Sequence, residues 1–418
     1  MAGGGVMTGR VEFWFDFSCP YAYVASTRIE ALARRAGAEL DPRPMLLGGV
    51  FRARGTPQNL SATLNPAKAA HNLNDMRRQA QQAGVPLHMP PGHPLRTVEA
   101  LRCVLAVGEP FMPLAHRFYR AYWAEGRDIG EGEVVAAILT EAGLDAATVR
   151  ARAASDAIKD ELRRRTDEAV ERGIFGVPSC FVGDAMFWGN DRLDMVEAAL
   201  GGAPASLRVP TGTSLAPTDL YFDYSSPFAY LALAQAEATF GGAASWRPLL
   251  LGGLFRSVGT PDVPLFAQSP EKRRHTLVDL GRQAERAGLA FAWPTRFPVN
   301  TVLALRMTLR ANLAGSSRGR ALIVRIARAL WAEDRDIADP AVLAGLADEL
   351  EFPGAAMVAA AGEAKAELFA ATGAAEAAGV FGVPSFVVHA PGREPLLYWG
   401  VDRIEWAARA AAGDETFM

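Results

Sequence analysis

The chain has 418 residues, half of them apolar, which is enough to bury two hydrophobic cores. Its formal net charge of -3 is spread along the sequence and gives no indication of a nucleic-acid partner. No apolar run reaches the roughly 18 residues that span a membrane, and the three cysteines are too few for a disulfide framework. We therefore expect a soluble cytoplasmic protein with neither a nucleic-acid nor a membrane partner.

The first predicted strand is Val11–Phe15, and it follows a glycine-rich stretch over residues 1–9 that predicts a loose tail and not a signal peptide. After the strand comes Asp16, and a helix is expected over Val24–Ala36, with Pro20 near its first helical position. Cys19 would then lie at the helix N-terminus, where free N–H groups and the helix dipole favour a thiolate.

The rest of the first half completes one domain. Its predicted elements are a strand at Glu39–Met45, helices from about Pro66 to Arg172, a β-hairpin of Cys180–Val182 and Ala185–Trp188 around Gly183-Asp184, and a helix at Asp191–Leu200. Residues 201–217, rich in Gly, Pro, Ser and Thr, are expected to form a linker.

Five motifs of the first half recur in the same order in the second half, roughly 200 residues later, which is a normal domain length. The pairs are FDFSCPYAY and FDYSSPFAY, LLGGVFR and LLGGLFR, WAEGRDI and WAEDRDI, GIFGVPS and GVFGVPS, and WGNDR and WGVDR. The second copy follows the same order of elements, with its final hairpin lengthened by the loop 389–395. The chain is thus a tandem duplication.

The predicted fold class is α/β, with two tandem thioredoxin-like domains that each carry an inserted all-helical subdomain. Domain 1 is expected over residues 10–200, with its insertion at about 60–172, and domain 2 over residues 218–413, with its insertion at about 264–378. Several side chains with reactive or aromatic groups are expected to lie in the core instead of a site: Phe15, Phe17, Tyr21, Tyr23, Cys103 and Cys180.

The DFSCPYAY, GVFGVPS and WGNDR blocks resemble the 2-hydroxychromene-2-carboxylate isomerases, which belong with kappa-class glutathione transferases in the DsbA-like branch of the thioredoxin superfamily. The resemblance covers essentially the whole chain, once per repeat. It implies an active serine directly before the proline that follows the strand. That position is Ser226 in the second repeat and Cys19 in the first.

The resemblance also implies a glutathione site in each repeat. A valine before a cis-proline would pair with the cysteinyl part of glutathione, the Asp-Arg of the WGxDR segment would lie by its γ-glutamyl end, and a lysine would help to hold its glycyl carboxylate. The implied residues are Val177, Pro178, Asp191, Arg192 and Lys68, and Val383, Pro384, Asp402, Arg403, Lys272 and Asn300. From the residues alone, the two aspartates could equally be helix N-caps and the two lysines solvated surface charges.

The two repeats differ at the site itself. The first has Cys19 in place of serine, Ala22 where a second cysteine would complete a CxxC motif, and Arg96 where the second has Asn300. The second has Val401 where the first has Asn190. We expect the isomerase-like site in the second repeat, and either a structural role or a monothiol site in the first.

The activity implied by the resemblance is glutathione-dependent isomerisation of a small aromatic substrate from aromatic-hydrocarbon breakdown. A glutathione thiolate stabilised by Ser226 would add to a conjugated carbon and leave again, so that glutathione is not consumed. The alternatives are a glutathione transferase, a thiol–disulfide oxidoreductase that uses Cys19, and a non-catalytic scaffold. We expect the two repeats to form an internal pseudo-dimer within a monomer.

Overall fold

The structure is a computed structural model that describes residues 9–203 and 214–418. The predicted tail over residues 1–9 lies outside the described residues except for Gly9, and so does most of the predicted linker over residues 201–217. The chain divides into two compact units. Unit 1 comprises residues 1–64 and 76–206, and unit 2 comprises residues 65–75 and 207–418.

Unit 1 is built on a four-stranded sheet with the order β2-β1-β3-β4. Strand β1 (Arg10–Phe15) is parallel to β2 (Glu39–Pro44), and the helix α1 (Pro20–Arg35) connects them. The hairpin of β3 (Ser179–Val182) and β4 (Ala185–Trp188) adds to the other edge of β1 in antiparallel orientation. The predicted thioredoxin-type sheet and its hairpin are confirmed.

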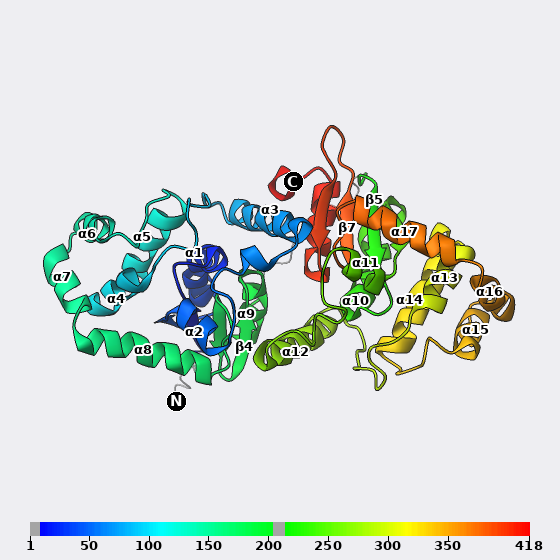
Figure 1. Ribbon diagram of the computed structural model, residues 1–418, viewed down its shortest axis with the longest axis horizontal. Coiled ribbons are helices and arrows are strands. Elements are labelled where there is room, and N and C mark those ends of the chain that lie inside the picture. The colour runs from blue at the N-terminus through cyan, green and yellow to red at the C-terminus, as the bar shows by residue number, and fades with distance from the viewer. Residues whose placement is uncertain (1–8, 204–213) are drawn as a thin grey trace, which may run out of the picture. The chain divides into compact units, whose positions relative to one another are not determined.

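The helices of unit 1 are inserted between β2 and β3 and return to the sheet through α8 (Figure 1). They are α2 (Leu47–Ala53), the part of α3 (Pro66–Gln82) that follows Asp75, α4 (Val98–Val107), α5 (Met112–Trp123), α6 (Gly132–Glu141), α7 (Ala146–Ala153) and α8 (Asp156–Glu171). A 3-10 turn (Asn190–Arg192) and α9 (Leu193–Ala199) end the unit.

The two faces of β1 carry different side chains, because successive residues of a strand point to opposite sides. Val11, Phe13 and Phe15 enter the core, where Phe17, Tyr23, Cys103 and Cys180 are also buried, as predicted. Tyr21 is only partly buried, so its assignment to the core was wrong.

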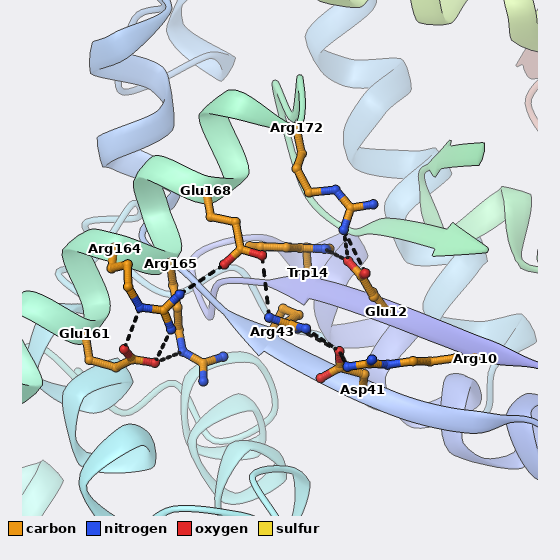
Figure 2. Close-up of polar contacts among 10 residues, drawn as sticks. All are labelled: Arg10, Glu12, Trp14, Asp41, Arg43, Glu161, Arg164, Arg165, Glu168 and Arg172. Atoms are coloured by element: carbon orange, nitrogen blue, oxygen red, sulfur yellow. Dashed lines mark hydrogen bonds and ion pairs between the residues drawn. The ribbon is translucent and has the colours of Figure 1, made fainter. Parts of the chain in front are cut away.

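Glu12 and Trp14 lie on the other face of β1, toward α8, and form part of a charged network (Figure 2). Glu12 accepts hydrogen bonds from Arg172 at 2.7 Å and from the indole of Trp14 at 2.9 Å. Arg43 of β2 bridges Asp41 at 2.7 Å and Glu168 of α8 at 3.6 Å. Ion pairs therefore fasten α8 to the sheet.

Unit 2 repeats this plan with a sheet in the order β6-β5-β7-β8. Its strands are β5 (Thr218–Phe222), β6 (Ala244–Pro248), β7 (Ser385–Val388) and β8 (Leu396–Trp399). Its helices are α10 (Pro227–Phe240), α11 (Leu251–Ser257), α12 (Pro270–Arg286), α13 (Val302–Arg310), α14 (Ser317–Trp331), α15 (Pro340–Asp348), α16 (Gly354–Ala361), α17 (Lys365–Ala377) and α18 (Ile404–Ala411). The predicted loop 389–395 separates β7 from β8.

Unit 2 also includes residues 65–75, the N-terminal part of α3 with the residue before it. In this segment His71 lies against the rings of Phe381 and Trp399, at centroid distances of 5.4 Å and 6.2 Å. Across the ranges 9–203 and 214–418, no helix is long and apolar enough to cross a membrane.

Candidate functional site

A buried aspartate ends the first strand of each unit and organises the turn that follows. In unit 2 the carboxylate of Asp223 accepts hydrogen bonds from Ser225 N–H at 2.9 Å, from Leu251 N–H at 2.8 Å and from the Thr301 hydroxyl at 2.7 Å. It therefore ties the turn to the first residues of α11 and α13. Burial raises the pKa of Asp223, and these hydrogen bonds oppose the shift.

Unit 1 contains the same arrangement around Asp16, which accepts from Ser18 N–H at 2.9 Å, from Leu47 N–H at 2.7 Å and from the side chain of Thr97. In the sequence, both aspartates are recognised only as repeated residues of the duplicated motif, and no role is predicted for them. Their structural role had one signal in the sequence, namely that Asp and the distant Thr keep their places in both repeats.

Ser226 is the N-cap of α10 and is almost fully buried, with 6% of its surface exposed. Its hydroxyl accepts a hydrogen bond from Ala229 N–H at 3.3 Å and donates one to the carbonyl of Val383, also at 3.3 Å. A hydroxyl at a helix start is close to unpaired N–H groups and to the positive end of the helix dipole. Ser226 is thus a neutral donor in a region that favours a negative charge.

Cys19 takes the same place at the start of α1 and donates its thiol hydrogen to the carbonyl of Val177 at 3.0 Å. Burial raises the pKa of Cys19 to about 12, and the nearby charge of Asp16 acts in the same direction. This shift opposes the thiolate that we expected at this position, although the Cys19 side chain is only partly buried. The loss of hydration on burial outweighs the hydrogen bonds from the helix start, which lower the pKa.

The predicted cis peptide bonds are present at Val177-Pro178 and Val383-Pro384. The backbone N–H groups of Val177 and Val383 donate no backbone hydrogen bond within the described parts of the chain. The tryptophan of the WGxDR segment packs behind this loop, since a Cβ placed on Gly382 would lie 2.8 Å from Trp399 Nε1. The GVPS and WGxDR motifs thus form one structural element beside Ser226.

Asp402 and Arg403 lie in the 3-10 turn Val401–Arg403 that leads into α18, and their side chains are 3.5 Å apart. The guanidinium of Arg403 is buried and donates to both oxygens of Asp75, at 2.7 Å and 3.0 Å, in the segment 65–75 that belongs to unit 2. Asp402 does not cap α18, because the residue at the N-cap is Arg403.

Unit 1 has the same turn with a different hydrogen-bond network. Asp191 lies 3.3 Å from Arg192, and the N-cap of α9 is Arg192, so Asp191 is not a helix cap either. The buried side chain of Asn190 accepts from Arg28 at 3.2 Å and donates to Gln79 at 2.9 Å. In unit 2 the position of Asn190 is taken by Val401, whose apolar side chain cannot form these hydrogen bonds.

Both candidate lysines belong to unit 2, although Lys68 comes from the first repeat. Lys68 Nζ lies 5.0 Å from the ring centroid of Trp399. Burial lowers the pKa of Lys68 and of Lys272, and the charge of Lys68 lowers the pKa of Lys272 further. The two ammonium groups are therefore partly desolvated and close enough to repel each other, and they are not simply solvated surface charges.

Asn300 is exposed just before α13, where its side-chain oxygen accepts from Val302 N–H at 3.0 Å. Its neighbour Thr301 donates to Asp223, so the structure places Asn300 beside the turn that carries Ser226. In unit 1 the equivalent Arg96 is likewise exposed beside Thr97.

Comparison with known proteins agrees with the duplication of the domain. The model of the DSBA-like thioredoxin domain matches residues 10–201 and again residues 218–412. A 2-hydroxychromene-2-carboxylate isomerase from Sphingobium xenophagum is 30% identical over 194 residues, which is 46% of this chain and 99% of that protein. One from Pseudomonas putida is 31% identical over 195 residues, covering 46% and 94%.

The human glutathione S-transferase kappa 1 is 24% identical over 213 residues, which is 47% of this chain and 93% of that protein. Each of these relatives has about the length of one repeat. The chain therefore belongs to the DsbA-like thioredoxin family that includes the 2-hydroxychromene-2-carboxylate isomerases and the kappa-class glutathione transferases, and it carries the family's domain twice.

Proposed function

We propose that the chain is a glutathione-dependent isomerase of the 2-hydroxychromene-2-carboxylate type and that unit 2 is its active unit. The observation that carries the proposal is the buried Ser226 hydroxyl at the start of α10, beside Val383 and its cis-proline. The type of reaction is proposed from the two 2-hydroxychromene-2-carboxylate isomerases that are 30% and 31% identical to this chain.

The residues of unit 2 fit glutathione, which is an extended tripeptide with two carboxylates and one ammonium group. The free backbone N–H of Val383 next to Pro384 suits the cysteinyl carbonyl. Lys272 and Lys68 suit the glycyl carboxylate, because a bound anion would relieve their repulsion. Asp402 suits the γ-glutamyl ammonium, and Arg403, held by Asp75, would position that aspartate. Asn300 would lie at the edge of the site.

Bound glutathione would supply a sulfur nucleophile. When glutathione binds, the Ser226 hydroxyl would stop donating to the Val383 carbonyl. It would donate its hydrogen bond to the ligand sulfur instead. The N–H groups at the start of α10 add positive potential, so the thiol pKa of the ligand would fall. Burial strengthens both effects because water is excluded.

An aromatic surface beside the site supports an aromatic substrate. The indole of Trp331 donates to the carbonyl of Tyr224, in the same turn as Ser226, at 2.8 Å. Trp293 and Phe297 pack on Trp331, with ring centroids 5.6 Å and 6.1 Å away, and Phe266 follows at 6.0 Å from Phe297. Because Phe266 is 53% exposed and Trp293 36%, these rings offer an apolar face to a ligand.

In unit 1 we propose a weaker or modified site. Val177, Pro178, Asp191 and Arg192 keep the framework, but burial raises the pKa of the Cys19 thiol and Lys68 belongs to unit 2. The high pKa of Cys19 and the alanine at position 22 also argue against a thiol–disulfide oxidoreductase.

The proposal is tested by calorimetric titration with reduced glutathione and by isomerase assays on the wild type, Ser226→Ala and the matched variant Cys19→Ala. We expect Ser226→Ala to lower kcat by roughly 100-fold, as for loss of one donor to a developing anion, and Cys19→Ala to leave it unchanged. No binding at millimolar glutathione would exclude the proposal. If Cys19→Ala is the inactive variant, the chemistry belongs to unit 1.

A glutathione transferase remains the second candidate, because the kappa-class relative has the same domain. Product analysis separates the two, since an isomerase regenerates glutathione and a transferase releases a conjugate. Cytoplasmic location, supported by three free thiols, and a monomeric assembly stay predictions.

A further inference from the structure

We propose that unit 1 contains a binding site for a small dianion, formed by three arginines of the helical insertion. A cleft of about 320 Å³ lies beside the N-terminal part of α4, and Arg96, Arg102 and Arg150 line it together with a single carboxylate, Glu99. This volume is at the lower end of those that hold small molecules. The site is independent of the proposed glutathione chemistry.

The charges around the cleft are not balanced. Arg150 donates to Glu99 at 2.8 Å and so uses the only carboxylate of the lining. Outside the lining, Asp128 lies 2.9 Å from the position that a Cβ on Gly130 would take, and it accepts the N–H of Gly130 at 2.8 Å. Even with Asp128 counted, three guanidinium groups face two carboxylates, which leaves a net positive charge.

Arg102 has a buried N–H group without an acceptor in the part of the chain that the structure describes. Its Nε is buried, and no hydrogen-bond partner for it exists among the described residues. A buried guanidinium N–H without an acceptor is costly, and arginines usually satisfy such groups with carboxylate or phosphate oxygens. Arg306 of unit 2 has an equally unpartnered Nε in the described ranges, so this group alone does not indicate a ligand. In unit 1, however, Arg102 lines the cleft together with two further arginines, and the three together suit an oxyanion.

Two glycines lie directly against arginines of the cleft. A Cβ on Gly132 would lie 2.5 Å from Arg150 Nη2, and a Cβ on Gly130 would lie 2.9 Å from Asp128 Oδ1 and 3.2 Å from Arg96 Cβ. Larger residues at these positions would push Arg150 and Arg96 out of place.

Unit 2 has different residues at nearly all the positions that correspond to this cleft. Its counterparts of Arg96, Glu99 and Arg150 are Asn300, Leu303 and Val358, and Ala338 and Pro340 replace the two glycines. Arg306, the counterpart of Arg102, is retained and likewise has a buried Nε without a partner in the described ranges. Arg306 thus offers a matched control, an arginine in the same place without the other two.

The chemical class follows from the donors. Guanidinium groups bind carboxylate and phosphate oxygens in a planar, two-point geometry, and more than one arginine favours a ligand with two negative charges. A dicarboxylate and a phosphate share this chemistry, so succinate and inorganic phosphate are the probes. They are titrated separately by calorimetry into the full chain, without glutathione and at constant ionic strength.

We expect a saturable site whose affinity depends on Arg102. Arg102→Gln should weaken binding about tenfold, as for the loss of a charge-assisted hydrogen bond. Arg306→Gln should leave it unchanged. Glu99→Gln should tighten binding several-fold, because it removes the competing carboxylate and releases Arg150. A merely structural role of Arg102 cannot produce this opposite sign.

Tighter binding of phosphate would indicate a phosphorylated ligand, and tighter binding of succinate a dicarboxylate. The proposal is overturned if neither probe saturates by about 50 mM, or if Arg102→Gln and Arg306→Gln weaken binding equally. It is also overturned if Glu99→Gln, folded by circular dichroism, fails to strengthen binding.

Discussion

The turns at Cys19 and Ser226 have the same framework and different chemistry. Each lies at a helix start, beside a cis-proline and above a buried aspartate, and each side chain donates to a valine carbonyl, at 3.0 Å for Cys19 and 3.3 Å for Ser226. Burial affects them in opposite ways. A cysteine must ionise to act as a nucleophile, and burial opposes that, whereas a serine that acts as a neutral donor loses nothing by being buried. The environment that raises the pKa of Cys19 therefore suits Ser226.

The largest expected effect concerns the reactivity of Cys19. Because its pKa is raised from 9.0 to about 12, the thiolate fraction at pH 8 should be roughly 1000-fold below that of an ordinary cysteine. Alkylation by iodoacetamide, followed by mass spectrometry, should be slower by that factor and should still be rising with pH at pH 10. The variant Ser226→Cys provides the matched control and should also react slowly. Fast alkylation of Cys19 below pH 8 would show that the N–H groups at the helix start lower the pKa of Cys19 more than burial raises it.

The next prediction tests whether the two frameworks are energetically equal. Thr97→Val and Thr301→Val each remove a hydroxyl that donates to a buried carboxylate, without changing the side-chain shape. Each should lower the free energy of unfolding by about 2 kcal/mol, the usual value for a hydrogen bond to a charged group. Urea unfolding of the full chain measures both. Equal losses would show that the buried aspartate contributes equally to both turns, and a loss at Thr301 alone would show that the Thr97 hydrogen bond in unit 1 contributes nothing to stability.

The sequence was sufficient for the fold because its signals are local and repeated. The Gly183-Asp184 turn specifies the hairpin of β3 and β4, and the same motifs appear again in unit 2. The helix α2 was not predicted, because Gly48 and Gly49 are poor helix formers. The structure explains it, since Asp16 accepts the N–H of Leu47, and a Cβ on Gly49 would lie 2.7 Å from Thr166.

The candidate site was less accessible to sequence reasoning, because its properties arise from distant residues and from burial. The pKa of Cys19 is set by desolvation, which no local pattern reports. The Asp75–Arg403 pair joins residues far apart in the chain, and the division that places Lys68 in unit 2 is equally invisible in the sequence. Ser226 and its valine were predictable because their motifs are short and contiguous.

The smallest effect is expected on the sheet face that α8 covers in unit 1 (Figure 2). Arg172 binds Glu12 and lies over the ring of Phe181, 4.0 Å from its centroid. Unit 2 has Ala378 at this position, and the counterpart of Glu12, Asp219, pairs instead with Arg247 at 2.8 Å. The variant Arg172→Ala therefore gives the sheet face of unit 1 the alanine that unit 2 has at this position.

Because Arg172 and Glu12 are 26% and 17% exposed, their ion pair is screened only in part, and its loss should cost about 1 kcal/mol. Urea unfolding in low and high salt separates the contribution of the ion pair with Glu12 from that of the contact with the Phe181 ring. If the ion pair dominates, the loss shrinks in high salt. If the contact with Phe181 dominates, the loss is the same in both. No loss in either would mean that the contacts of Arg172 carry no energetic weight, and that α8 is held to the sheet by its other contacts, among them the ion pair of Glu168 with Arg43.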